Sequence, residues 1–242
     1  MSKSKRERHI VAVGGAGFSA ETGNLALERY VTNLTGTERA RVCFIPTASG
    51  DSQSYIDRFV AASEQLGWVP SVLSLFRGET PDIASVVLNQ DIIYVGGGNT
   101  RNMLVLWRDW GLDKLMREAW ERGIVLTGVS AGSICWFEQG VTDSVPGSLN
   151  PLTCLGFLTG SNCPHYNSEA ERQPSYTRFV GSGEMLPGYA TDDGVALHYT
   201  GSDLTHVISW IPGGRAFRVE RDGDAAIETL IEPTYLADLV NK

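Results

Sequence analysis

A serine flanked by glycines is the clearest candidate for chemistry in this chain of 242 residues. The segment from Gly128 to Gly132 reads GVSAG and fits the pattern G-x-S-x-G, with the apolar run Ile124–Gly128 before it and a helix-capable segment, Ala131–Phe137, after it. The glycines permit a sharp strand-to-helix turn that exposes the Ser130 hydroxyl at a helix N-terminus. The pattern predicts a nucleophile at Ser130; the plainer alternative is a serine that caps a helix.

A serine hydroxyl needs a neighbouring base to act as a nucleophile, and the chain has four histidines. His9 and His206 stand at the starts of expected strands, and His198 lies inside the apolar segment VALHY. His165, in CPHYN, directly follows an apolar strand and therefore lies at the same sheet edge as Ser130. We predict that His165 is the base.

The third member of such a site is a carboxylate that orients the imidazole. Asp143 lies in the segment VTDS, beyond the serine, and Asp192 and Asp193 lie in TDDG between two late strands. Each of them is also a common turn former, and spacing along the chain leaves the choice among them open.

A second glycine cluster, Gly96–Thr100 (GGGNT), ends another expected strand. We expect the amide of Gly98, with that of Ala131, to stabilise negative charge on a reacting carbonyl oxygen. A phosphate-binding loop is the rival interpretation, but no GK[ST] follows, which excludes a Walker loop. The run GAG at residues 15–17 lacks the third glycine of a dinucleotide fingerprint, and a metal site at Cys163 and His165 lacks a second pair of ligands.

Short apolar strands alternate with helical patterns over the first two thirds of the chain, which predicts a mostly parallel sheet with helices on both faces. The expected strands are His9–Gly14, Arg41–Pro46, Val69–Leu75, Asp91–Val95 and Ile124–Gly128. The expected helices are Leu25–Leu34, a stretch that ends near Leu66 with Ser52 or Ser54 as cap, one that begins near Thr100, and Leu112–Arg122.

The last third is expected to be antiparallel or mixed. An irregular excursion covers Glu138–Gly160, a strand ends near Cys163, and a polar helix follows around Ser168–Val180. Short strands are then expected at Gly188–Ala190, Val195–Tyr199, His206–Trp210 and Ala216–Val219. The fold class is therefore α/β in three layers, with short antiparallel strands in the last third. No linker or repeat interrupts residues 1–242, which predicts one domain with residues 1–8 as a flexible tail.

The composition narrows the class of protein. Twenty Lys and Arg against 28 Asp and Glu give a formal net charge of −8, which argues against a nucleic-acid partner. With 42% hydrophobic residues the chain can bury a core, yet no run approaches the ~20 apolar residues of a membrane span. Four cysteines without a CxxC pair indicate reduced thiols. We expect a cytoplasmic protein without membrane contact, as a monomer or a homodimer.

Taken in order, GGGNT, then GVSAG about thirty residues later, then NCPHYN and a DDG loop resemble the peptidase E (α-aspartyl dipeptidase) family, from about residue 9 to about residue 210. Cyanophycinase is a relative in the same superfamily. The resemblance implies a fold like that of class I glutamine amidotransferases, with serine in place of their nucleophilic cysteine. It also implies a serine dipeptidase that acts on a small peptide with neither a metal nor an organic cofactor.

Carried over residue by residue, Ser130 matches the family's nucleophile, His165 its base, and Gly98 and Ala131 its oxyanion donors. The family offers two acids, an aspartate after the elbow helix, which is Asp143 here, and a glutamate in the late loop. Asp193 stands at that late position and is one methylene shorter. We favour Asp193 slightly, because its loop follows a strand at the expected edge.

The resemblance also implies residues that recognise the substrate. The family's arginine beyond the histidine binds an aspartyl side chain, and Arg172 is the match, with Arg178 close by; a surface charge is the plainer alternative. Asn99 is a second expected substrate-binding residue. The segment after the elbow, SICWF, is bulkier than in peptidase E, and we expect its Trp136 in the core, although it could narrow the pocket.

These residues predict a serine hydrolase with a Ser-His-Asp triad that cleaves dipeptides with an N-terminal aspartate. One alternative is an esterase of the α/β-hydrolase type, whose acid precedes a histidine near the C-terminus; Asp143 meets the first condition and His165 fails the second. Another alternative is a non-catalytic module whose glycine loops hold a nucleotide or a small anion.

Overall fold

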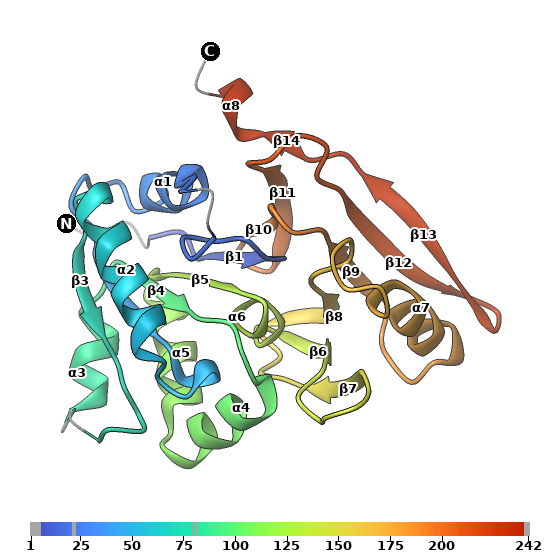
Figure 1. Ribbon diagram of the computed structural model, residues 1–242, viewed down its shortest axis with the longest axis horizontal. Coiled ribbons are helices and arrows are strands. Elements are labelled where there is room, and N and C mark those ends of the chain that lie inside the picture. The colour runs from blue at the N-terminus through green and yellow to red at the C-terminus, as the bar shows by residue number, and fades with distance from the viewer. Residues whose placement is uncertain (1–5, 21–22, 79, 81, 240–242) are drawn as a thin grey trace.

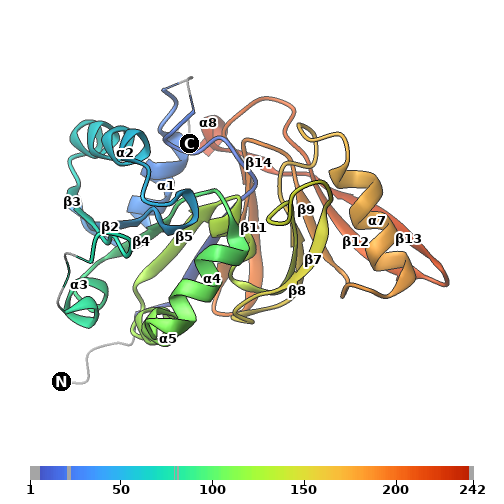
Figure 2. The ribbon, with the colours of Figure 1, turned by 60° about the horizontal axis from the view of Figure 1, so that its bottom comes forward.

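The computed structural model describes residues 6–20, 23–78, 80 and 82–239. Two sheets lie side by side and divide the chain between them (Figures 1 and 2). This arrangement confirms the α/β class, and it separates the late strands into two groups.

The larger sheet has eight strands in the order β14-β11-β10-β1-β5-β4-β2-β3. Their bounds are β1 (His9–Val13), β2 (Arg41–Ile45), β3 (Val69–Val72), β4 (Ile92–Val95), β5 (Val125–Val129), β10 (Val195–Thr200), β11 (Asp203–Ser209) and β14 (Thr234–Tyr235). Strands β1 to β5 run parallel, whereas β10 pairs antiparallel with β1. The strands expected in the first half of the chain all lie in this sheet.

Helices cover both faces of the parallel part, as Figure 1 shows. α1 (Ala26–Asn33) and α2 (Gln53–Leu66) pack on one face, and α3 (Ile83–Leu88), α4 (Thr100–Asp109) and α5 (Leu112–Glu121) pack on the other. The sequence of β1 reflects this, since all five of its residues are buried. Val11 and Val13 face the first pair of helices, while Ile10 and Ala12 face the opposite layer.

The second sheet has six strands in the order β13-β12-β9-β8-β6-β7. Their bounds are β6 (Phe137–Thr142), β7 (Asn150–Thr153), β8 (Leu158–Cys163), β9 (Gly188–Thr191), β12 (Ala216–Asp222) and β13 (Ala225–Ile231). β6, β8 and β9 run parallel, and α7 (Arg172–Ser182) packs on the β12–β13 hairpin, which projects from the body in Figure 1.

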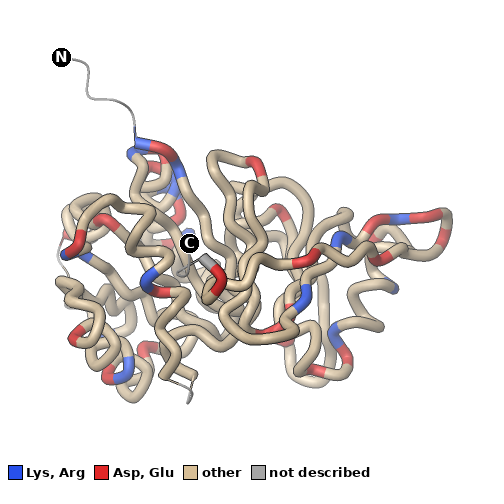
Figure 3. The backbone as a smooth tube through the Cα atoms, turned by 90° about the horizontal axis from the view of Figure 1, so that it is seen from above, with Lys and Arg blue, Asp and Glu red and all other residues tan. Residues whose placement is uncertain are grey.

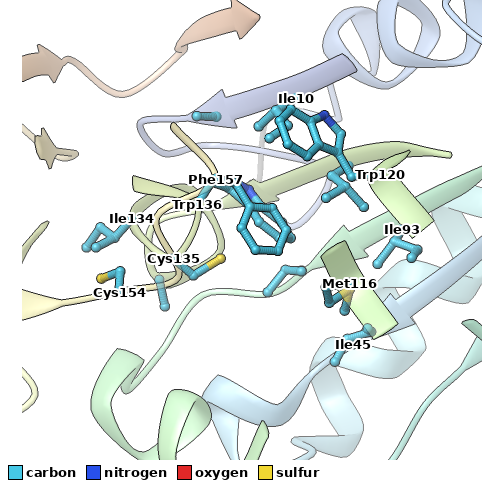
Figure 4. Packing of buried hydrophobic residues seen from close by; sticks show 14 of the residues in the cluster. Ile10, Ile45, Ile93, Met116, Trp120, Ile134, Cys135, Trp136, Cys154 and Phe157 are labelled. Carbon is cyan, nitrogen blue, oxygen red and sulfur yellow. The ribbon is translucent and has the colours of Figure 1, made fainter. Parts of the chain in front are cut away.

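One hydrophobic core joins the two sheets. Its residues include Ile10 and Leu126 of the larger sheet and Phe137 and Leu158 of the smaller one. Figure 4 shows aromatic side chains at this junction, where Trp120 stacks on Phe157 and Trp136 lies beside it. Trp136 is fully buried, as expected, and it does not line the pocket beside Ser130 described below.

The segment after the serine differs from its prediction. The helix α6 (Ala131–Ile134) has only four residues, and the chain re-enters a strand at Phe137. The excursion expected over residues 138–160 holds most of β6, all of β7 and the start of β8. The sequence of β7 does not indicate a strand because it contains Pro151. The proline is tolerated because β7 lies at a sheet edge, where a missing backbone N–H leaves no neighbour unpaired. The sequence also gave no sign of α3, β13, β14 or the terminal α8 (Leu236–Leu239).

Residues 1–5 of the expected N-terminal tail lie outside the described residues. Arg6 and Arg8 make contacts with the body: Arg6 Nη1 lies 3.6 Å from Asp91 Oδ1, and the Arg8 guanidinium lies 4.4 Å from the ring centre of Trp120. The four cysteines are buried and free. Within the described ranges, no helix is both long and apolar enough to cross a membrane.

Acidic and basic residues are interspersed along the backbone in Figure 3, and no continuous basic stripe appears in that view. This distribution agrees with the negative net charge of the sequence.

Candidate active site

The candidate residues come from the carboxyl ends of strands in both sheets. β5 leads into Ser130 and β4 into the GGGNT loop. In the smaller sheet, β6 leads into Asp143, β8 into His165 and β9 into Asp193. Since the strands within each set are parallel, their ends gather at one edge. The larger sheet thus supplies the candidate nucleophile, and the smaller sheet supplies the candidate base and acids. The expectation that His165 and Ser130 share one sheet edge is wrong, because β5 and β8 belong to different sheets.

Ser130 occupies a sharp turn between β5 and α6. Its backbone angles, φ 57° and ψ −109°, lie in a region that residues with a side chain rarely adopt. The turn packs against β4 so closely that a Cβ on Gly132 would lie 2.3 Å from the carbonyl oxygen of Val95. Glycine is therefore required by packing after the serine, and the strained backbone points to a functional role for the turn.

His165 and Asp193 form a direct pair. Nδ1 of His165 lies 2.7 Å from Oδ1 of Asp193, and both side chains are largely shielded from solvent. His165 has a positive φ of 57°, so its backbone, like that of Ser130, is held in an uncommon conformation. Asn167 supports the pair, because its Oδ1 accepts the backbone N–H of Asp193 at 2.9 Å.

The surroundings of Asp193 favour its ionised form. Burial raises the pKa of this carboxyl. The hydrogen bond and charge of His165, with smaller effects of Ser168 and Arg172, together lower the pKa by more than burial raises it. The net result is a pKa below the ordinary value for aspartate. An ionised carboxylate at Nδ1 holds the imidazole with Nε2 free to accept a proton.

The other two candidate acids lie elsewhere. Oδ2 of Asp192 accepts the Nε–H of Arg215 at 2.9 Å, and the residue is 2% exposed. Asp143 has a side chain that is 68% exposed, with Oδ1 4.0 Å from Nη2 of Arg172. Neither forms a hydrogen bond with His165 among the described residues.

Strand β1 links the two halves of the site. The N–H of Ser130 donates to the carbonyl of Val13 at 3.1 Å. Two residues further on, a Cβ on Gly15 would lie 2.9 Å from Cε1 of His165 and 1.9 Å from Oδ1 of Asp193. No hydrogen bond joins Ser130 Oγ to His165 within the part of the chain that is described, as is common for such groups without substrate.

Two backbone N–H groups near the serine are free. Gly98 has a φ of 135°, which only glycine adopts readily, and its N–H makes no hydrogen bond within the described ranges. The same holds for Ala131, the first residue after the serine. The loop lies against Ser130, because a Cβ on Gly97 would be 3.3 Å from that of the serine.

Arg172 is buried at the start of α7 rather than exposed on its surface. Its side chain is 3% exposed; Nε donates to Glu169 Oε2 at 2.6 Å and Nη1 donates to the carbonyl of Val141 at 2.8 Å. Arg178, the nearby alternative, is 59% exposed and pairs with Glu184. The surface interpretation therefore applies to Arg178 and not to Arg172.

A pocket of about 220 Å³ opens beside the serine. Its lining is mainly polar and consists of Gly98, Asn99, Ser130, Asp143, Ser144, Glu169 and Arg172. Asn99 uses its side chain internally: Oδ1 caps α4 by accepting the N–H of Asn102 at 2.9 Å, and Nδ2 donates to the carbonyl of Ser144 at 3.1 Å. The structure thus brings Ser130, Gly98 and Arg172 around one cavity.

Several residues of this region had no assigned role in the sequence interpretation. In the sequence, Gly15 is only part of a weak nucleotide motif, and Asn167 is a neutral residue of NCPHYN. No pattern in the sequence indicates a role for Glu169 or Ser144. The position of Gly15 directly after the first expected strand is the only sequence feature that singles it out. Its neighbours His165 and Asp193 lie more than a hundred residues away in the sequence, so no local pattern indicates the contact.

The remaining histidines lie outside this arrangement. Nδ1 of His9 is 3.1 Å from Nε2 of His198, whose Nδ1 is 2.7 Å from the hydroxyl of Tyr30. Burial lowers the pKa of His198 to about 4, with a further contribution from the other two histidines, so it is neutral at pH 7. Within the described residues, no group of three or more His, Cys, Asp or Glu side chains is placed to hold a metal ion.

Sequence comparison finds relatives that are named as peptidases. An uncharacterized peptidase of Bacillus subtilis (strain 168), YgaJ, is 53% identical over 212 residues, which cover 88% of this chain and 92% of the relative. The uncharacterized peptidase Lmo0363 of Listeria monocytogenes is 28% identical over 65% of this chain and 81% of its own.

Solved structures share the fold at low sequence identity. A peptidase from an acI-B1 Actinobacterium superposes with a TM-score of 0.69 and 16% identity, covering 95% of this chain and 96% of the other. A putative peptidase E protein from Listeria monocytogenes EGD-e has a TM-score of 0.58 and 22% identity, with coverage of 84% and 98%.

The family model described as peptidase family S51 matches residues 10–207, most of the chain. The resemblance to the peptidase E family is thereby confirmed. Membership supports a peptidase and gives no support to the esterase or to the binding module considered from the sequence. The chain belongs to peptidase family S51.

Proposed function

We propose that this protein is a serine peptidase that hydrolyses short peptides, with N-terminal aspartyl dipeptides as preferred substrates, through an acyl-enzyme and a Ser130–His165–Asp193 triad. The observation that carries the proposal is the 2.7 Å pair of His165 and Asp193 at the carboxyl ends of strands in the smaller sheet, which the chain at the end of β1 connects to the strained turn of Ser130 in the larger sheet. A nucleophile, an oriented base and an ionised acid are the groups that acyl transfer needs.

In this mechanism His165 Nε2 removes the proton of Ser130, whose oxygen attacks the peptide carbonyl. The free N–H groups of Gly98 and Ala131 bind the oxygen that becomes negative in the tetrahedral intermediate. His165 then gives its proton to the leaving amine, and water releases the acyl group by the same steps in reverse. Asp193 holds the imidazole in one tautomer throughout.

The pocket supports a short substrate. A volume of about 220 Å³ accommodates roughly one amino-acid residue, and its lining offers charged groups rather than apolar surface. Arg172 is its only cation among the lining residues, and Nη2 of this arginine lies 4.0 Å from Oδ1 of Asp143. A buried arginine that binds the substrate's carboxylate would disfavour neutral side chains, because these leave the charge less well paired.

The test is hydrolysis of Asp-Leu, Glu-Leu, Asn-Leu and Ala-Leu by the wild type and by Ser130→Ala. We expect cleavage of Asp-Leu to exceed that of the other three and to vanish in Ser130→Ala. Ser54→Ala, an exposed serine on α2, is the matched control and should retain full activity. Activity that survives in Ser130→Ala would remove the serine from the mechanism, and equal cleavage of all four peptides would remove the aspartate preference.

A further inference from the structure

Three charged residues line the pocket beside Ser130: Arg172, Glu169 and Asp143. One of them is a guanidinium and two are carboxylates, so a single cationic group faces two acidic groups in this pocket. A substrate residue that enters it without a positive group would leave one carboxylate unmatched.

The two carboxylates are not equivalent. Glu169 forms an ion pair with Arg172, in which Oε2 lies 2.6 Å from Nε. Asp143 lies 4.0 Å from Nη2 of the same arginine, beyond hydrogen-bond distance, and no hydrogen bond reaches its carboxylate within the described part of the chain. Its side chain is 68% exposed. Asp143 is thus the carboxylate in this pocket that is available to a ligand.

The side chains of Asn99 and Ser144, two neutral polar residues of the pocket, already form hydrogen bonds within the protein. The side-chain amide of Asn99 accepts the N–H of Asn102 at the N-terminus of α4 and donates to the carbonyl of Ser144. The hydroxyl of Ser144 lies 2.7 Å from that of Thr142 and accepts the N–H of Arg101 at 3.1 Å. The groups that remain for recognition are the Asp143 carboxylate and the outer edge of the Arg172 guanidinium.

This pair matches the charges of an N-terminal residue. In an aspartyl residue the α-nitrogen and the β-carboxyl carbon are three bonds apart, which places the two charges within about 4–5 Å of each other. The available carboxylate and the guanidinium nitrogen are separated by a similar 4.0 Å, with the opposite signs.

Resting on the peptidase function proposed above, we propose that Asp143 is the residue that binds the N-terminal ammonium group of the peptide, and that the preference for substrates with this group depends on it. Asp143 is then a specificity-determining residue. It follows β6, on the opposite side of β8 from Asp193, so one carboxylate orients His165 and the other holds the substrate.

The experiment compares two substrates that differ only in the ammonium group, Asp-Leu and succinyl-leucine, in the wild type and in Asp143→Asn. We expect the wild type to show a kcat/KM about 10- to 100-fold higher for Asp-Leu, the range of a charge-assisted hydrogen bond. Asp143→Asn should lose most of this advantage on Asp-Leu while its rate on succinyl-leucine stays within about threefold. Asp203→Asn, an exposed carboxylate on β11, controls for net charge.

Two results would overturn the inference. An equal loss on both substrates would mean that Asp143 only helps to hold Arg172, and an unchanged preference for Asp-Leu would mean that the ammonium binds elsewhere. The pair Ala-Leu and propionyl-leucine repeats the comparison without the β-carboxylate, so an error about aspartate does not affect the conclusion.

Labelling of Ser130 by a fluorophosphonate separates this inference from the proposed function, because labelling needs the nucleophile and no peptide turnover. We expect Asp-Leu to slow labelling more than succinyl-leucine does, and to lose that advantage in Asp143→Asn. Absence of labelling in the wild type would contradict the serine peptidase itself. Labelling with equal protection by both compounds would overturn only the ammonium site.

Discussion

Asp193 and Asp143 follow the two strands that flank β8, and only one of them bonds to the imidazole at its end. The pair of His165 and Asp193 is partly shielded from water, and the carboxyl has a lowered pKa. The aspartate is shorter than the glutamate expected from the family, yet it reaches Nδ1 at 2.7 Å. The closeness of the β9–β10 turn to His165 makes up for the missing methylene.

Asp193→Asn is expected to lower kcat by about 100-fold or more, because the amide no longer stabilises the imidazolium or fixes its tautomer. The measurement is kcat on whichever dipeptide the wild type cleaves, with Asp203→Asn as the control of equal charge. A kcat within about threefold of the wild type would show that another group orients His165.

The same substitution has a defined effect on stability. A pKa that is lower in the folded state means that the ionised carboxylate stabilises the fold above about pH 3.9, the ordinary value, and that this contribution is lost as pH falls through the folded value. Urea unfolding should therefore show the wild type as the more stable protein at neutral pH, and the difference should shrink as the pH is lowered below the ordinary pKa of aspartate. A difference that grows on acidification would contradict this assignment.

Gly15→Ala tests the contact between the first strand and the pair. Its Cβ would lie 1.9 Å from Oδ1 of Asp193 and 2.9 Å from Cε1 of His165, so one of them must move. We expect kcat to fall by about 100-fold, since displacements near 1 Å cost that much in a catalytic arrangement. Gly36→Ala, where a Cβ meets nothing within 4 Å but φ is 67°, controls for a loss of stability away from the site, because alanine is strained there without touching the pair. Normal activity of Gly15→Ala would mean that the pair tolerates displacement.

At the scale of elements, the loop between β1 and α1 covers a buried carboxyl group. Glu28 of α1 is 0% exposed; its Oε1 accepts the hydroxyl of Tyr94 at 3.3 Å, and Oε2 has no partner in the described residues. Burial raises its pKa to about 7, against smaller effects of hydrogen bonds that lower it. A Cβ on Gly17 would lie 2.4 Å from the Tyr94 hydroxyl, so the loop fits tightly over the pair.

This burial makes stability depend on pH with a known sign. Between the ordinary value of about 4.3 and the folded value of about 7, the folded state keeps a proton that the unfolded chain has lost, so stability falls as pH rises. Glu28→Gln removes the effect, and its stability relative to the wild type should increase by about 2–3 kcal/mol from pH 5 to pH 8. Glu64→Gln, on the exposed face of α2, should show no such increase in urea unfolding. A constant difference across this range would mean that Glu28 is ionised in the fold.

Elements were predicted best where their pattern is local. The sequence predicts the strands of the first half and its helices except α3 to within a few residues, because apolar runs give the buried faces of these elements and glycines give their ends. The strands of the excursion after Ser130 are not predicted, since β6 and β7 are stabilised by pairing with each other and with β8 rather than by their own pattern.

At the scale of the whole molecule, the two sheets share a core. Ile10 and Leu126 of one sheet and Phe137 and Leu158 of the other belong to the same buried cluster. Neither sheet can lose its packing without exposing the other. We therefore expect one domain to unfold in a single cooperative transition.

The measurement is urea unfolding followed by far-ultraviolet circular dichroism and by tryptophan fluorescence. Coincident curves are expected, since secondary structure and the burial of Trp120 and Trp136 at the sheet junction should be lost together. Two separated transitions would show that the smaller sheet is an independent unit.

The sequence alone determined the α/β class, the family resemblance and the candidates Ser130 and His165. These follow from short-range information. The glycines around the serine encode the sharp turn, and the strand before each residue places it at the carboxyl end of a strand. Local chemistry is enough because the backbone geometry of a strand-to-helix turn depends on neighbouring residues.

Only the tertiary structure decided which carboxylate meets the imidazole, that Arg172 is buried in the pocket, and that Gly15 contacts the His165–Asp193 pair. Asp143 and Asp193 both follow parallel strands next to β8, so the sequence favours Asp193 only slightly. The order of strands within a sheet and the direction of each side chain result from packing between residues far apart in the chain. No local pattern carries that information.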